Sequence, residues 1–262
     1  MINRIHLNPF GYMLVCFKKN EILDLDIDEL LAIVNKHKLL VLRGFAQVDK
    51  ELFVKFCQKF SNYKFLEWNF GPVMEMKENE KPSNYLFSRE EVPYHWDGAF
   101  YIVPDFLVFS CVSAPKENAG GETLFANTEE IYNSLPQETL SHWEKVFVEY
   151  ETEKIAHYGG KIKVPLLQKH PHLSTNIIRY AEAVTTKLNP VQLNIYGLEN
   201  CAQEKFISEM KEKLYHSQYC YQHLWQTGDV LIADNHSLVH GRTAFNVNST
   251  RYLRRIQLIK SN

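Results

Sequence analysis

Cysteine is sparse in this chain, and its spacing excludes the common cysteine-based folds. The chain has 262 residues and five cysteines, none of them in a C-x-x-C pair. An odd, widely spaced set argues against both a disulfide framework and a zinc ribbon. We interpret these thiols as buried or incidental groups in a reducing compartment. They are Cys16, Cys57, Cys111, Cys201 and Cys220.

Long apolar runs, blocks of like charge and repeats are also missing. The N-terminus has no apolar run of signal-peptide length, and no apolar stretch of about 18 residues follows it. We therefore expect a cytoplasmic protein with no membrane contact. The formal net charge is −2 at pH 7, and no Lys/Arg block stands out. Nucleic acid is not an expected partner, because phosphate binding needs concentrated positive charge.

The composition is that of an ordinary globular protein. Hydrophobic residues make up 45% and charged residues 23% of the chain, which argues against disorder. A chain of this length can bury a large core as one unit, so we predict a single domain over residues 1–262. The sequence leaves open whether that domain forms a homo-oligomer.

The apolar patterning predicts short strands with helices between them. Buried or alternating apolar runs predict strands, and acidic caps followed by helical spacing predict helices. Turn residues predict mostly loop from residue 63 to residue 91. The expected architecture is mainly β with inserted helices (α+β), around a jelly-roll core, the double-stranded β-helix. Helices are predicted after Asp26, over 49–60, over 128–150 with a break at Leu135-Pro136, and over 199–215; strands are predicted over 39–42, 106–112, 122–125, 229–234 and 252–259.

A His-x-Asp pair at His95 and Asp97 is the first candidate metal site. In extended chain, residues i and i+2 point the same way, so both side chains can reach one ion while Trp96 packs on the other side. With a distant histidine they would form the two-imidazole, one-carboxylate face of non-haem iron oxygenases, which leaves three positions open. By itself the pair also fits a solvated loop.

Downstream motifs supply the missing histidine. Residues 225–235 read WQTGDVLIADN, residues 240–245 read HGRTAF, and residues 120–123 read GGET. Together with His-x-Asp, these segments resemble the TauD/TfdA family of iron(II)/2-oxoglutarate dioxygenases over residues 92–259. The resemblance implies that His95, Asp97 and His240 are the iron ligands and thus the catalytic residues. The alternative for His240 is a capping or packing role.

Other histidines lie near the motif or in an inserted region. His236 falls in the variable part of the motif, and His170-Pro171-His172 sits among turn residues. We do not expect His170 or His172 to bind the metal.

The same resemblance implies a site for 2-oxoglutarate and a site for the substrate. It places the distal carboxylate of 2-oxoglutarate on Arg251, helped by Thr123, which suits a bidentate guanidinium. Arg255 matches the spacing of the arginine that holds the acidic group of the substrate in taurine-type members, and Phe100 matches a position that lines the substrate pocket. The alternatives are a surface ladder of arginines on an edge strand and ordinary core packing of Phe100.

Three short segments read HWDGAFY at residues 95–101, SAP at 113–115 and ANT at 126–128. Their local sequence is similar to that of the PvcB-like branch of the family. The resemblance implies desaturation or hydroxylation, with dioxygen, of a small carboxylate-bearing substrate derived from an aromatic amino acid, such as a tyrosine isonitrile. Asp97 argues against halogenation, because related halogenases carry a small residue there. A taurine, sulfonate or amino-acid hydroxylase and a non-catalytic binding module remain alternatives.

Overall fold

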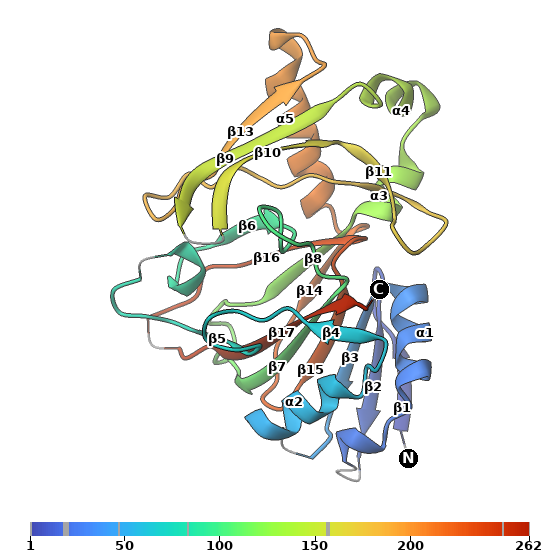
Figure 1. The fold of residues 1–262 in the computed structure, drawn as a ribbon, viewed down its shortest axis with the longest axis vertical. Coiled ribbons are helices and arrows are strands. Elements are labelled where there is room, and N and C mark those ends of the chain that lie inside the picture. The colour runs from blue at the N-terminus through green and yellow to red at the C-terminus, as the bar shows by residue number, and fades with distance from the viewer. Residues whose placement is uncertain are drawn as a thin grey trace.

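Two β-sheets that face each other form the centre of the protein (Figure 1). The computed structural model describes residues 2–17, 21–46, 48–82, 84–155, 158–247 and 249–261. Except for the parallel pair β2–β3, the strands of the larger sheet run antiparallel. In order, that sheet contains β1 (Ile2–His6), β2 (Tyr12–Cys16), β3 (Leu39–Arg43), β15 (Val230–Asp234), β7 (Phe106–Ser113), β17 (Tyr252–Lys260) and β4 (Tyr63–Phe65), and β5 (Met74–Lys77) pairs with β17.

The smaller sheet carries the motif histidines and closes the barrel. Its order is β14 (Cys220–His223), β8 (Thr123–Asn127), β16 (Leu238–Arg242) and β6 (Val92–His95). The inner core between the sheets joins Phe109, Leu231 and Leu253 from the larger sheet to Phe125 from the smaller one. The predicted jelly-roll architecture, mainly β with inserted helices, is therefore confirmed.

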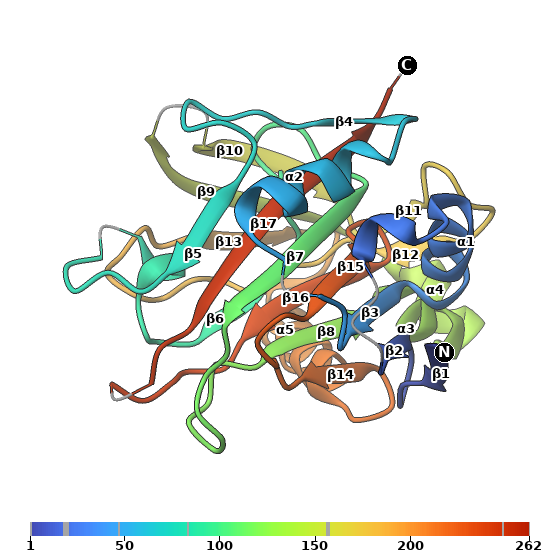
Figure 2. The same ribbon diagram turned by 90° about the horizontal axis from the view of Figure 1, so that it is seen from below.

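Side-chain alternation explains how one strand serves two cores. On β3, Leu39 and Val41 face the inner core, whereas Leu40 and Leu42 face the opposite side of the sheet. That outer side is covered by α1 (Ile27–His37) and α2 (Lys50–Gln58), both visible beside the sheet in Figure 2. Because both faces of the sheet are covered, its central strands read as continuous apolar runs.

A second layer packs on the outer side of the smaller sheet. It contains a sheet of β9 (Phe147–Ile155), β10 (Tyr158–Pro165) and β13 (Gln192–Tyr196), and the pair β11 (Leu167–Lys169) and β12 (Asn176–Ile178). The helices α3 (Thr128–Ser134), α4 (Gln137–Trp143) and α5 (Asn200–Tyr215) complete it. In Figure 1 this layer forms the upper part of the molecule. It matters for function because Tyr150 and Tyr158, from β9 and β10, reach the main cavity.

Most predicted elements are confirmed, and one predicted helix is too long. The helices after Asp26, after Asp49 and over 199–215 form, as do the predicted strands in the two facing sheets. The helix predicted to continue to residue 150 ends earlier, and residues 147–150 begin β9 instead. The 63–91 region contains β4 and β5, which are held by pairing with β17. Residue 83 of the predicted loop lies outside the described residues.

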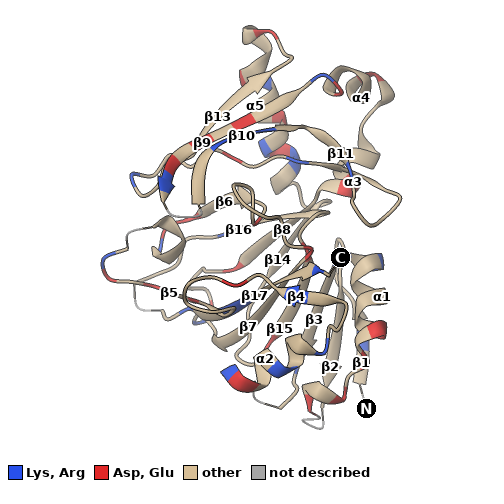
Figure 3. Ribbon diagram, in the orientation of Figure 1, with Lys and Arg blue, Asp and Glu red and all other residues tan. Residues whose placement is uncertain are grey.

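The charged side chains are interspersed over the molecule. Figure 3 shows acidic and basic residues side by side on both layers. Among the described residues, no helix is long and apolar enough to cross a membrane.

The glycine pair of the GGET motif brings two loops into contact. Gly120 has φ +81° and bridges Phe245, and a Cβ at Gly120 would lie 2.0 Å from the Ala244 carbonyl oxygen. The next carbonyl, that of Gly121, accepts a hydrogen bond from Arg251 Nε at 2.7 Å. Glycine is therefore required at 120 for both its conformation and its close contact.

Replacing Gly120 with alanine tests this contact. Gly228 is the matched control, because it has φ +93° but nothing within 4 Å of an added Cβ. Both variants bear the cost of a positive φ, and only Gly120→Ala adds a clash. We expect Gly120→Ala to lower the free energy of unfolding by about 2 kcal/mol more than Gly228→Ala, as measured by urea denaturation. Equal losses would show that the two loops move apart without cost.

Candidate iron and 2-oxoglutarate site

Antiparallel pairing of β6 with β16 brings His95, Asp97 and His240 together. His95 ends β6 and is the register partner of His240 on β16, and Asp97 follows two residues after His95. Asp97 Oδ1 lies 3.8 Å from Nε2 of each histidine. Asp97 and His240 are buried, and His95 is partly exposed to the cavity.

The protonation states of these groups suit a metal ligand set. His95 Nδ1 lies 2.9 Å from the Pro93 carbonyl oxygen, so Nδ1 carries the hydrogen and Nε2 is free to bind. Burial lowers the pKa of His95 and holds the pKa of His240 well below its ordinary range, so both imidazoles are neutral at pH 7. Burial opposes ionisation of Asp97, but its pKa is lowered, above all by the positive charge of Arg255.

Asp97 Oδ1 lies close enough to each histidine to share one divalent ion with it. Two atoms that each bind an ion at about 2.1 Å can lie at most about 4.2 Å apart. Both 3.8 Å carboxylate–imidazole separations satisfy this limit, and the ligand atoms of all three residues lie within 4.8 Å of one another. Two neutral imidazoles and one carboxylate, all on one side, form the donor set of non-haem iron(II) sites with open positions.

The backbone around Asp97 is held by Asn235, which has 1% exposure. Its Oδ1 accepts from the Asp97 backbone N–H at 3.0 Å, and its Nδ2 donates to the carbonyl oxygens of Asp97 at 3.1 Å and Pro104 at 2.9 Å. Gly98 then turns the chain with φ +81°, where a Cβ would lie 2.0 Å from the Ile102 carbonyl oxygen. Asn235 thus fixes the position from which the Asp97 carboxylate points at the histidines.

Arg251 and Thr123 meet on the other side of His240. Arg251 Nη2 donates to Thr123 Oγ1 at 3.0 Å, and His95, His240, Thr123 and Arg251 line one small cavity. Arg251 has 4% exposure, and among the described residues no carboxylate lies within ion-pair distance of it. Burial lowers the pKa of Arg251 to about 9. A buried cation without an anion could receive the distal carboxylate of 2-oxoglutarate.

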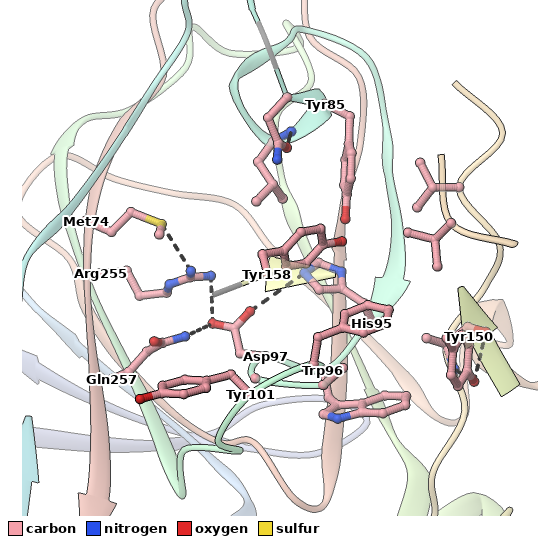
Figure 4. Close-up of a pocket in the computed structure, with 18 of the residues that line it drawn as sticks. Met74, Tyr85, His95, Trp96, Asp97, Tyr101, Tyr150, Tyr158, Arg255 and Gln257 are labelled. Atoms are coloured by element: carbon pink, nitrogen blue, oxygen red, sulfur yellow. Dashed lines mark hydrogen bonds and ion pairs between the residues drawn. The ribbon is translucent and has the colours of Figure 1, made fainter. Parts of the chain in front are cut away.

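A mostly apolar cavity opens on His95 and Asp97 from the second layer. Its volume is about 300 Å³, and Phe100, Tyr85, Tyr158, Arg255 and Gln257 are among its lining residues. In Figure 4 the hydroxyl of Tyr85 points toward Tyr158, beside His95. Phe100 packs edge-on against Tyr158 with ring centroids 5.3 Å apart. The structure therefore places Phe100 in the wall of the cavity.

Arg255 is not the free guanidinium that its predicted substrate role implied. Its Nη1 forms an ion pair with Asp97 Oδ2 at 2.7 Å, and its Nη2 contacts Met74 Sδ at 3.1 Å (Figure 4). Its Nε is buried and has no hydrogen-bond partner in the part of the chain that the structure describes. Arg255 thus retains free donor capacity, but part of it is committed to Asp97.

A second group of potential ligands, Asp105, His172 and His236, is already hydrogen-bonded. Asp105 Oδ1 lies 2.6 Å from His172 Nε2 and 2.9 Å from His236 Nε2. Arg179 Nη2 approaches His236 Nδ1 at 3.3 Å, so the hydrogen of His236 is on Nε2 and points at Asp105. A metal on Nε2 would turn Nδ1–H against Arg179. We therefore interpret this group as a structural tie.

His170 belongs to the same tie. Its Nε2 lies 3.1 Å from Asp234 Oδ2, and its Nδ1 accepts from the backbone N–H groups of His172 and Leu173. His170 and His172 therefore pair with Asp234 and Asp105, and neither belongs to the group around Asp97.

A jelly roll with two histidines and a carboxylate at its mouth defines a non-haem iron oxygenase. The model of the family described as "Taurine catabolism dioxygenase TauD, TfdA family" matches residues 14–257. The chain belongs to the TauD/TfdA family and is an iron(II)/2-oxoglutarate-dependent dioxygenase. The alternative of a non-catalytic binding module is not supported.

Curated relatives and solved structures lie in the predicted branch. A 3-((Z)-2-isocyanoethenyl)-1H-indole synthase of Fischerella ambigua is 41% identical, covering 97% of this chain and 94% of the relative. A tyrosine isonitrile desaturase of Pseudomonas aeruginosa is 33% identical, covering 87% and 80%. The crystal structure of PvcB from P. aeruginosa is 28% identical with a TM-score of 0.82, covering 99% and 93%. The resemblance to the PvcB-like branch is therefore confirmed.

Sequence reasoning missed Gln257, Asn235, Tyr85 and Tyr158 as parts of the site. Asn235 stands inside the quoted motif, and Gln257 lies two residues after Arg255 on the same face of β17, so both carried a positional signal. Tyr85 and Tyr158 lie in a predicted loop and an inserted strand. No spacing in the sequence connects them to His95.

Alanine at His95, Asp97 or His240 tests the metal site. We expect each variant to lose stoichiometric iron(II) or cobalt(II) binding and turnover, because two remaining donors cannot fix the ion. Circular dichroism should show an intact fold, since a site at the barrel mouth supplies little of the ~5–15 kcal/mol of domain stability. Full activity and unchanged metal affinity in Asp97→Ala would contradict the assignment.

Arg251→Ala tests the 2-oxoglutarate site. A charge-assisted pair contributes roughly 1.5–3 kcal/mol, so the apparent constant for 2-oxoglutarate should rise by about tenfold or more. The constant for the prime substrate should move less. Arg254→Ala is the matched control, because Arg254 points to the opposite face of β17 and pairs with Glu75. A larger effect on the prime substrate than on 2-oxoglutarate would show that the roles of the arginines are reversed.

Proposed function

We propose that this enzyme desaturates or hydroxylates a small isonitrile that derives from an aromatic amino acid and carries a carboxylate. The observation that carries the proposal is the aromatic cavity of about 300 Å³ that opens on His95 and Asp97. That volume suits one phenol or indole ring with a short side chain. The named activities of the relatives from F. ambigua and P. aeruginosa support the same substrate class.

The metal and 2-oxoglutarate are proposed to bind between the two arginines. His95 Nε2, Asp97 Oδ1 and His240 Nε2 would hold iron(II), and Arg251 with Thr123 would hold the distal carboxylate of 2-oxoglutarate. When bound, iron(II) and 2-oxoglutarate would activate dioxygen for oxidation of a nearby C–H bond of the substrate. The protein's part is to keep the neutral imidazoles aimed at one point and to keep the buried guanidinium ready for its anion.

The aromatic ring is proposed to enter from the other side, along Phe100. Phe100 and Tyr158 meet edge to face at 5.3 Å, which offers a wall for an aromatic ring. Apolar contact alone lets a ring slide, so a polar anchor is needed to set its distance from the metal. Arg255, which lines this cavity, is the proposed anchor for the substrate carboxylate.

A sulfonate or amino-acid hydroxylase is the second candidate. The main cavity argues against it, because its lining is mostly aromatic and aliphatic and Arg255 is the arginine that it contains. A small zwitterionic substrate would leave much of that apolar surface without contact. A carboxylate-bearing aromatic isonitrile would contact both the apolar lining and Arg255.

A substrate panel tests the proposal. The iron-loaded protein is incubated with 2-oxoglutarate and, separately, aromatic isonitriles, the free amino acids and sulfonates. We expect coupled succinate release and a product mass change only with a carboxylate-bearing aromatic isonitrile. Mass loss of two hydrogens indicates desaturation, and gain of one oxygen indicates hydroxylation. Strong coupled turnover of taurine with no turnover of any aromatic isonitrile would contradict the proposed substrate class.

A further inference from the structure

The two carboxylate oxygens of Asp97 have different surroundings. Oδ1 lies 3.8 Å from Nε2 of His95 and of His240. Two groups approach Oδ2 from the opposite side: Arg255 Nη1 forms an ion pair with it at 2.7 Å, and Gln257 Nε2 donates a hydrogen bond to it at 2.5 Å. Figure 4 shows both side chains converging on this oxygen. One oxygen therefore faces the proposed metal position, and the other faces β17.

Both residues lie on β17, a strand that pairs with neighbours on both of its edges. Residues 255 and 257 are two apart on β17, so they point to the same side of the sheet. Arg255 and Gln257 are each 4% exposed, and β17 pairs with β7 along this stretch. Their positions are fixed by the sheet rather than by a mobile loop.

The fold itself gains little from the Gln257 amide. Its Oε1 is buried and has no hydrogen-bond partner among the described residues, which is a cost that an apolar side chain of similar size would avoid. Leu253, four residues earlier on the same face, shows that β17 accepts an apolar side chain there. The one hydrogen bond of the amide goes to Asp97, so the benefit of a glutamine here lies in what it does to that carboxylate.

We propose that Gln257 and Arg255 are positioning residues that hold Asp97 as a one-oxygen ligand of the metal. The proposal rests on the assignment of His95, Asp97 and His240 as the metal site. A carboxylate without these two contacts can rotate and bind the ion through both oxygens, because hard cations accept one-oxygen or two-oxygen coordination. A second oxygen would fill one of the three positions that 2-oxoglutarate and dioxygen require. The contacts of Arg255 and Gln257 with Oδ2 keep that position open.

Metal binding in Gln257→Leu is the first test. Cobalt(II) replaces iron(II), because its absorption spectrum reports the coordination number without any turnover. We expect about tenfold weaker cobalt(II) binding and a changed visible spectrum, since the carboxylate is no longer held in one orientation. Gln222→Leu on β14, an exposed position, is the matched control and should match the wild type.

Chemical rescue separates positioning from general damage to the fold. Asp97→Gly removes the carboxylate but leaves the Arg255 and Gln257 donors around the vacated space. We expect added formate to restore cobalt(II) binding in Asp97→Gly. In Asp97→Gly/Gln257→Leu, the formate concentration for half restoration should rise about tenfold. Urea denaturation checks that both proteins are folded, and Asp97→Ala replaces Asp97→Gly if the glycine variant is not.

The outcomes distinguish a failure of the positioning role from a failure of the metal site. An unchanged cobalt(II) spectrum and affinity in Gln257→Leu, or equal or absent formate rescue in the single and double variants, would overturn the positioning role. Tight cobalt(II) binding in His95→Ala and His240→Ala would overturn the metal site beneath it.

Discussion

The register between β6 and β16 is the constraint on which the rest of the site depends. It sets His240 opposite His95, and the next turn brings Asp97 back to the same point. A slip of one residue would turn one histidine to the opposite face of its strand. The register is held on the other edge of β16 by pairing with β8, which places Thr123 opposite Arg242. One strand, β16, therefore positions both the proposed metal ligands and part of the proposed 2-oxoglutarate site through its two pairings.

Two chemically different cavities flank the three ligands. On one side, a small cavity holds the unpaired guanidinium of Arg251 against Thr123. On the other, a larger aromatic cavity includes Phe100 and reaches Tyr158 of the second layer. A charged end suits a dicarboxylic co-substrate, and an aromatic wall suits the prime substrate. β17 links the two sides, because Arg251 and Arg255 lie at and near its start on the same inner face.

The sequence predicts the parts of this site that have short-range geometry. The i, i+2 spacing of His95 and Asp97 and the alternation along β17 follow from the strand period alone, and the family motif supplies His240. What fails has long-range causes. Residues 147–150 were predicted as helix because the partners that make them a strand, β10 and β13, lie later in the chain. The pairing of Arg255 and Gln257 with Asp97 spans about 160 residues and has no local signal.

The central claim is that the metal, 2-oxoglutarate and an aromatic substrate bind at separate, adjacent positions at the mouth of the barrel. Its most direct test is a crystal structure with iron or manganese, 2-oxoglutarate and an aromatic isonitrile, with the metal located by anomalous scattering. The account predicts one strong peak bonded to His95, Asp97 and His240, 2-oxoglutarate reaching Arg251 and Thr123, and the aromatic ring beside Phe100. A metal peak at Asp105, His172 and His236 instead, or 2-oxoglutarate seated in the aromatic cavity, would contradict it.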